Sequence, residues 1–355
     1  MAYDQVKTEE MSFSIKIALI QGKEGQEMSR KRMIALVTVV AVLAFGMLCF
    51  GTMDGRAAEK KIVIGSSIIT YEHPFYIDVV KGMQRVVDKA GVEFLLNDPK
   101  AKLAPQVSAL ETYIARNVDA LVVYGVDPVG VVPVVEEATA KGIPVITADM
   151  ELKTDKVVTF VGSNNIEIGT KVGKWTKEYI EKNMGGKAKI AIVAWLVSVA
   201  QQQRVKGFED QVTQLPGVEI VTTQNVEEAL RENAMTVTEN ILSAHKDVDI
   251  VYGSNQTCCM GAVSAVEALG KKVKVVGVDI DTEMVKAIED GKLFATVAQQ
   301  PLFLGEASVQ AALIKVKGKD CLGSDFVPER ITIPVVLVTK DNLEEVTKTL
   351  EILEY

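Results

Sequence analysis

Beyond residue 60, short apolar runs alternate with amphipathic stretches of helical length. Residues 61–69 (KIVIGSSII) form an apolar run that predicts a strand. Residues 74–91 place apolar side chains about every 3.6 positions, which predicts a helix. Further strands are predicted at 92–96, 119–125, 143–149, 157–163, 189–195, 218–224, 249–255, 273–279 and 294–300. This alternation is typical of a parallel sheet, because near-continuous Val and Ile runs suit strands that helices cover on both faces.

The predicted strands number about a dozen, which is too many for one compact open sheet. We therefore predict two sheets, with a boundary near residue 162, where the run VTFVGSNN interrupts the earlier rhythm. Each half is a βαβαβ run that closes with a strand ending in a polar residue, so the two lobes should resemble each other. The predicted fold class is α/β, with two similar doubly wound parallel-sheet lobes.

The amino-terminal segment has the pattern of a secretory signal. Residues 29–32 (SRKR) include three basic side chains and precede an uncharged stretch over residues 33–51. Cleavage after Ala57 would place small side chains at both positions that a signal peptidase recognises. We therefore expect residues 1–57 to be a signal segment, with Met28 as an alternative translation start. An uncleaved membrane anchor is the rival interpretation, because about 20 apolar residues can span a bilayer.

Composition narrows the class of function. Hydrophobic residues make up 48% and charged residues 24% of the 355 residues, as in a folded globular chain. The net charge of -8, without a basic face, argues against nucleic-acid binding. Two histidines leave little room for a histidine-based metal site. The sequence has no motif for dinucleotides, no P-loop and no nucleophile elbow, so we expect no enzyme activity and no cofactor.

The four cysteines are too few for a disulfide scaffold. Cys258 and Cys259 are adjacent and rarely bridge each other, and removal of the signal segment would leave Cys321 as the third. An odd number of cysteines cannot pair completely within one chain. We therefore expect buried or free thiols, with a disulfide to Cys321 as the alternative.

Polar side chains follow the predicted strands at the carboxyl ends, where open α/β sheets bind ligands. Asp149 and Asp279 each come directly after an apolar run, one in each half of the chain. The other candidates are Asn255 and Gln299 after later strands, Arg204 early in a helix, and His73, Phe75 and Tyr76 after the first strand. Carboxylates, amides and an arginine satisfy sugar hydroxyls, and aromatic rings stack on the apolar face of a sugar. A lone aspartate after a strand is often a helix cap, so the prediction depends on the shared location of the set.

Several stretches recur together in one known family. They are ITYEHPFY at 69–76, IPVITADM at 143–150, RVKGFEDQV at 204–212, SNQTCCMGAV at 254–263, and VVGVDI with DGKLFATVAQQP at 275–280 and 290–301. In their order and spacing, the chain from about residue 60 to 340 resembles the ribose-type periplasmic sugar-binding proteins, the solute-binding proteins of ABC importers. The resemblance implies the periplasmic binding protein-like I fold, whose two lobes are joined by a three-crossing hinge. It assigns residues 60–162 and 300–330 to an amino-terminal lobe, and residues 163–299 and 331–355 to a carboxyl-terminal lobe.

The resemblance also implies roles for individual residues. Phe75 and Tyr76 would stack on a sugar ring, and the groups that would bind its hydroxyls are Asp149, Arg204, Asn255, Asp279 and Gln299. The chain departs from ribose binders at several positions of the candidate site, and among these His73 and Tyr124 replace asparagine and Met150 replaces arginine. These changes make the site less polar on one side and argue against simple ribose. Trp195 could supply another stacking face, although core packing is the plainer interpretation.

The function that the resemblance implies is capture of a small ligand in a cleft between the lobes. The ligand would be a monosaccharide, a deoxy sugar, a cyclic polyol or a similar molecule, and an ABC permease would receive it. We expect a periplasmic monomer, with a chemoreceptor or sensor kinase as a further partner to consider. Two alternatives stay open: a membrane-anchored or receptor-coupled sensor of the same fold, and a binder of a non-sugar such as a furanone.

Overall fold

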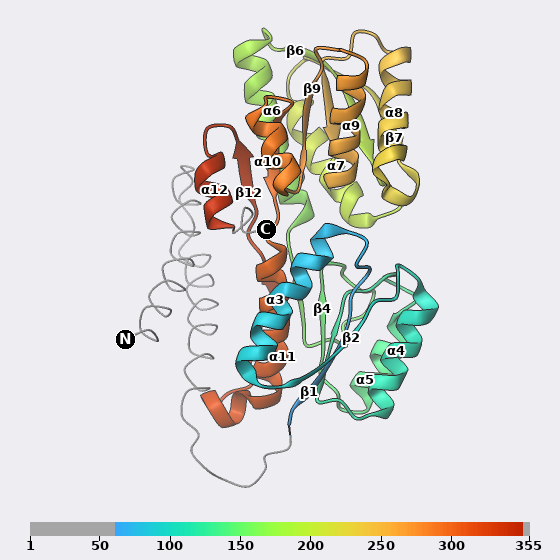
Figure 1. The fold of residues 1–355 in the computed structure, drawn as a ribbon, viewed down its shortest axis with the longest axis vertical. Helices are drawn as coiled ribbons and strands as arrows, with labels where there is room; N and C mark the ends of the chain where they lie inside the picture. Colours follow the sequence, from blue (N-terminus) through green and yellow to red (C-terminus); the bar gives the residue numbers. More distant parts are fainter. Residues whose placement is uncertain (1–60, 351–355) are drawn as a thin grey trace. The chain divides into compact units, whose positions relative to one another are not determined.

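The computed structural model describes residues 61–350, and the contacts within it divide the chain into two lobes (Figure 1). The first lobe consists of the described residues up to Gly162 together with Gln300–Ile333. The second consists of Ser163–Gln299 together with the described chain from Pro334 onward. The chain therefore passes from one lobe to the other three times. The predicted signal segment, residues 1–57, lies outside the described residues.

The first lobe is built on a six-stranded parallel sheet with the order β11-β5-β4-β3-β1-β2. Its strands are β1 (Val63–Ser67), β2 (Glu93–Asn97), β3 (Ala120–Val123), β4 (Val145–Ala148), β5 (Thr159–Gly162) and β11 (Arg330–Thr332). Helices α3 (Pro74–Ala90) and α11 (Pro301–Leu322) pack together on one face, and α4 (Leu103–Ala115) and α5 (Val132–Ala140) pack on the other. Because β11 pairs with β5, the first lobe extends past the boundary that we predicted at residue 330.

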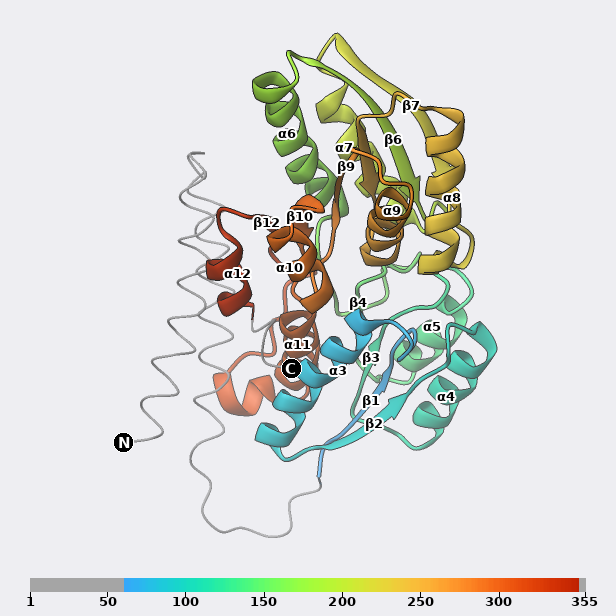
Figure 2. The ribbon, with the colours of Figure 1, turned by 45° about the horizontal axis from the view of Figure 1, so that its top comes forward.

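The second lobe repeats this arrangement, with the strand order β12-β10-β9-β8-β6-β7. Its strands are β6 (Lys187–Ala194), β7 (Gly217–Asn225), β8 (Ile250–Gly253), β9 (Lys274–Val278), β10 (Leu293–Ala298) and β12 (Val336–Thr339). Its helices are α6 (Asn165–Asn183), α7 (Val199–Val212), α8 (Arg231–Ala244), α9 (Gln256–Ala268), α10 (Thr282–Glu289) and α12 (Leu343–Thr349), with a short 3₁₀ turn at Glu227–Ala229. Figure 2 shows α6 and α8 on opposite sides of this sheet. Strand β12 runs antiparallel to β10, whereas the other described strand pairs are parallel.

The two sheets correspond strand by strand, with β1 to β5 matching β6 to β10 in order. Apolar side chains fill both faces of the first sheet, and a further core cluster lies beneath α6 and α7 in the second lobe. This burial on both faces explains why the strands are near-continuous apolar runs. The predicted fold class, two similar doubly wound α/β lobes, is confirmed.

Each lobe contains a helix pair that approaches closely through glycines. Gly82 and Gly305 lie at the contact between α3 and α11, and Gly169 and Gly207 at the contact between α6 and α7. A Cβ added to Gly169 would lie 1.9 Å from the carbonyl oxygen of Arg204, far inside van der Waals contact. Glycine at this position therefore lets α7 pack against α6 at the level of Arg204.

The described part of the chain, residues 61–350, includes no helix that is both long and apolar enough to cross a bilayer.

Candidate functional site

Asp149 and Asp279 occupy equivalent positions in the two sheets. Asp149 directly follows β4, and its backbone N–H donates to the carbonyl of Val161 in β5 at 2.9 Å. Asp279 directly follows β9, and its N–H donates to Val297 in β10 at the same distance. Both have a positive φ, 63° for Asp149 and 78° for Asp279. This left-handed backbone is costly for any residue with a Cβ, although aspartate tolerates it better than most. Such strain often occurs at functional positions, so the pair is a candidate for a binding role.

In the first lobe, the start of α3 supplies a partner for Asp149. Pro74 opens the helix, and His73 caps it, since its Nδ1 accepts from the N–H of Phe75 at 3.2 Å. One residue further on, the Tyr76 hydroxyl donates to Oδ2 of Asp149 at 2.7 Å. The rings of His73, Phe75 and Tyr76 meet edge to face, with centroids 5.2 to 6.5 Å apart. The first lobe thus combines one carboxylate with an aromatic cluster at the carboxyl ends of its strands.

Tyr124, Met150 and Trp195 differ in how deeply they lie. Tyr124 is fully buried; its ring packs edge to face with Tyr76, and its hydroxyl shares a hydrogen bond with Ser308 at 3.1 Å. Burial raises the pKa of the Tyr124 phenol well above its ordinary value. Tyr124 therefore supports Tyr76 from within the core and does not present its hydroxyl at the strand ends. Met150 and Trp195 are both half-buried, directly after Asp149 and β6 respectively.

In the second lobe, Asp279 is held by groups from two neighbouring elements. The N–H of Gln256, at the start of α9, donates to Oδ2 at 3.0 Å, and Nε2 of Gln299 donates to Oδ1 at 2.7 Å. The side chain of Thr296 donates to the backbone carbonyl of Asp279 at 2.7 Å. Asp279 is only 8% exposed. A carboxylate at the amino terminus of a helix is stabilised by the helix dipole as well as by the N–H bond.

Asn255 and Arg204 lie on the same edge of the second sheet. Asn255 caps α9, since its Oδ1 accepts from the N–H of Cys258 at 2.9 Å, while its Nδ2 has no hydrogen bond to the described residues. Arg204 donates from Nε to Oδ1 of Asn165 at 2.9 Å and from Nη1 to the carbonyl of Ser254 at 3.1 Å. The two bonds fix the guanidinium at the carboxyl end of β8, so predicted candidates Arg204, Asn255, Asp279 and Gln299 all belong to one edge of this lobe.

Two further polar side chains in the second lobe were not predicted. Gln201 Oε1 and Tyr252 Oη are buried, and neither has a hydrogen-bond partner among the described residues. Buried polar atoms are nearly always bonded, so an unpartnered group indicates a place for a ligand or an ordered water. The one sequence signal that could have indicated Gln201 is its helical spacing, three residues before Arg204.

The two described cysteines are buried free thiols, so the disulfide alternative does not hold for Cys258 or Cys259. Burial raises the pKa of the Cys258 thiol to about 12. A thiol with so high a pKa is unreactive, because the thiolate is the nucleophile. Residues 61–350 hold no group of histidine, cysteine and carboxylate side chains that could bind a metal ion.

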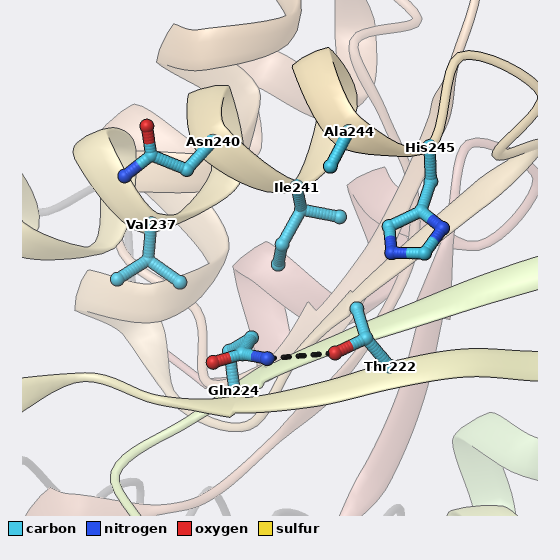
Figure 3. Close-up of a pocket in the computed structure, with 7 residues that line it drawn as sticks. All are labelled: Thr222, Gln224, Val237, Asn240, Ile241, Ala244 and His245. Atoms are coloured by element: carbon cyan, nitrogen blue, oxygen red, sulfur yellow. Dashed lines mark hydrogen bonds between the residues drawn. The ribbon is translucent and has the colours of Figure 1, made fainter.

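An open depression of about 260 Å³ lies between β7 and α8 (Figure 3). Its lining residues are Thr222, Gln224, Val237, Asn240, Ile241, Ala244 and His245. Gln224 donates to Thr222 across its floor at 2.8 Å. None of the predicted site residues lines this depression, so it is separate from the strand-end groups described above.

The fold and the strand-end groups define the class of two-lobed α/β binding proteins. Comparison with known proteins agrees with this class. Residues 64–320 match the family model of the periplasmic binding protein domain. The ribose import binding protein RbsB of Bacillus subtilis (strain 168) is 32% identical over 79% of this chain and 88% of its own length. RbsB of Escherichia coli (strain K12) is 30% identical over 82% of this chain and 95% of its own length.

A solved structure extends the comparison. It is an ABC transporter solute binding protein from Bacillus halodurans C-125 with bound myo-inositol, 30% identical, with a TM-score of 0.73. The match covers 82% of this chain and 100% of that one. The chain therefore belongs to the periplasmic binding protein family, whose members similar to it include sugar-binding proteins of ABC importers. The predicted resemblance is confirmed.

Proposed function

We propose that this protein binds a small sugar or cyclic polyol outside the cytoplasm and delivers it to an ABC importer. The observation that supports this most directly is the pair of equivalent aspartates, each in a left-handed backbone conformation at the carboxyl end of a strand. Two of the relatives are named for ribose import, and a third was solved with myo-inositol. Both compounds are small, neutral and rich in hydroxyls.

The groups around each aspartate suit a polyhydroxylated ligand. In the second lobe, Asp279 supplies acceptors, and Asn255 Nδ2 and Arg204 Nη2 are donors without a partner among the described residues. In the first lobe, Asp149 supplies acceptors beside the rings of Phe75 and Tyr76. Each hydroxyl both donates and accepts, and a charge-assisted hydrogen bond contributes about 1.5–3 kcal/mol. A handful of such bonds is enough for micromolar affinity, which corresponds to about -8 kcal/mol.

We further propose that Asp149 and Asp279 each hold hydroxyls of the ligand, and that Phe75 and Tyr76 stack on its apolar face. The equivalence of the two aspartate positions supports a shared role. The protein would act as a monomer that presents its bound ligand to a permease. It would bind its ligand without converting it.

The direct test is a thermal-shift and calorimetric panel on the purified protein. The panel contains D-ribose, D-allose, L-arabinose, myo-inositol, a deoxy sugar and a furanone. We expect one hydroxyl-rich compound to raise the melting temperature by several degrees and to be recovered unchanged, because a ligand that binds only the folded state stabilises it. If no compound of the panel binds, or if the bound compound is chemically converted, the proposed function is wrong.

Export is a separate part of the proposal, supported by the basic and then apolar pattern of residues 1–57. Amino-terminal sequencing of the protein recovered from the periplasm should begin at Ala58. Recovery of a longer chain in the membrane fraction would instead establish the anchored form.

A further inference from the structure

We propose that Gln201 and Arg204 form a subsite in the second lobe that binds one hydroxyl of the ligand. The ligand would therefore have a hydroxyl, and not a methyl group, at this point. The inference rests on the proposed function, and it narrows the class of ligand to a fully hydroxylated compound at this edge.

The position of Gln201 supports a role at the strand ends. Gln201 lies in the first turn of α7, three residues before Arg204, so the two side chains share one face of the helix. Both are buried, with Gln201 7% and Arg204 5% exposed. Helix α7 follows β6, so its first turn lies beyond the carboxyl end of that strand, on the edge that also holds Asn255 and Asp279.

The side-chain oxygen of Gln201 is buried without a hydrogen bond. Its Oε1 has no hydrogen-bond partner among the described residues, and it does not bond to the Arg204 guanidinium. Arg204 uses Nε and Nη1 within the lobe, while Nη2 makes no hydrogen bond to the described residues. An acceptor and a donor are thus left on one helix face, three residues apart. An unpaired buried group is costly, so both should find a partner when the ligand is bound.

The chemistry of these two groups selects a hydroxyl. The amide oxygen of Gln201 only accepts, and the guanidinium of Arg204 only donates. A hydroxyl accepts from the arginine and donates to the glutamine, so it satisfies both. A methyl group would leave both unpaired.

Two neighbouring side chains extend this polar environment. Ser254, whose carbonyl accepts from Arg204, has a fully buried hydroxyl. The phenol of Tyr252 is buried without a partner, with its ring stacked on Phe208 at a centroid distance of 4.1 Å. Burial raises the pKa of the Tyr252 phenol, and the positive charge of Arg204 acts in the opposite direction, so the two groups share one environment. The subsite is therefore surrounded by groups that favour a polar occupant.

The test is calorimetric titration of the wild type and of Gln201→Met, which keeps the volume of the side chain and removes its acceptor. The probes are D-ribose, D-allose, L-arabinose and myo-inositol, followed by the monodeoxy forms of the compound that binds best. We expect Gln201→Met to weaken binding of the parent compound about tenfold or more. One monodeoxy analogue should bind the wild type about as weakly as the parent compound binds Gln201→Met. The Gln201→Met substitution should not weaken the binding of that analogue further.

The matched control is Gln203→Ala, which removes an exposed glutamine of the same helix and should leave every affinity unchanged. Equal binding of the parent by wild type and Gln201→Met overturns the subsite while leaving the proposed function intact. An equal loss for the parent and all its deoxy analogues also overturns it, because that result indicates a purely structural role. If the wild type binds none of the four compounds, the proposed function fails and the subsite with it.

Discussion

The strand ends of the two lobes hold equivalent aspartates by different means. Asp279 accepts from a backbone N–H at the start of α9 and from the amide of Gln299, and it is almost completely buried. Asp149 accepts from the hydroxyl of Tyr76 and is half-buried. A backbone amide in a helix cannot move without the helix, whereas a phenol can turn about its side-chain bonds. The second lobe therefore presents a rigid carboxylate, and the first presents one that an adjustable side chain helps to position.

The largest effect should come from Asp279→Ala in the absence of ligand. The substitution leaves a buried backbone N–H and the amide of Gln299 without their acceptor. Since each lost bond to a charged group costs about 1.5–3 kcal/mol, we expect the free energy of unfolding to fall by about 3 kcal/mol. Urea denaturation measures this loss. Asp290→Ala, at an exposed carboxylate after α10, is the control and should change little. A loss below about 1 kcal/mol for Asp279→Ala would show that the second-lobe carboxylate is not rigidly held.

The equivalent change in the first lobe should cost less. Asp149→Ala removes the acceptor of a half-buried phenol, which water can partly replace, so we expect a loss of about 1–1.5 kcal/mol in the same urea experiment. The quantity to compare is the loss in free energy of unfolding for Asp149→Ala against that for Asp279→Ala. If Asp149→Ala destabilises the protein as much as Asp279→Ala, the proposed difference in rigidity is wrong.

The shared backbone conformation gives a third, smaller effect. Glycine adopts a positive φ without strain, whereas alanine does not. At each of the two positions, the Asp→Gly variant should therefore be more stable than the Asp→Ala variant by about 1 kcal/mol. The difference should be similar in both lobes, because φ is 63° at Asp149 and 78° at Asp279. Glycine variants no more stable than the alanine variants would contradict the strained backbone at these positions.

The smallest effect should come from Tyr76→Phe, which removes the hydrogen bond to Asp149 and keeps the ring. The carboxylate stays but is less well oriented, so we expect ligand affinity to fall about threefold, equivalent to about 0.6 kcal/mol. Calorimetric titration with the best compound of the sugar panel measures the change. Tyr71→Phe, at an exposed tyrosine of the same lobe, should have no effect. Unchanged ligand affinity in Tyr76→Phe would show that the Tyr76 hydroxyl does not orient Asp149.

Much of this fold could be predicted from local patterns. Continuous apolar runs locate the strands, because helices cover both faces of each sheet. The residue just past each run then identifies Asp149 and Asp279, since parallel strands all end at one edge. The antiparallel pairing of β12 with β10 had no such local signal.

The site was less predictable where it depends on contacts between distant residues. Tyr124 was expected to reach the ligand, yet its hydroxyl bonds to Ser308, 184 positions away, and draws the ring into the core. The burial of Gln201 was not predictable, because it is the first of three consecutive glutamines and only the packing of α7 separates it from exposed Gln202 and Gln203. Sequence pattern indicates where a side chain lies along an element, whereas tertiary packing decides what the side chain contacts.

The central claim is that Asp149 and Asp279 are both needed to bind the ligand. The most direct test is calorimetric titration of the wild type, Asp149→Asn and Asp279→Asn with the best compound of the panel, after circular dichroism has shown both variants to be folded. Asparagine keeps the shape of aspartate and removes its charge. We predict that each single substitution weakens binding about 100-fold, because each carboxylate accepts from ligand hydroxyls. Wild-type affinity in either folded variant would contradict the claim.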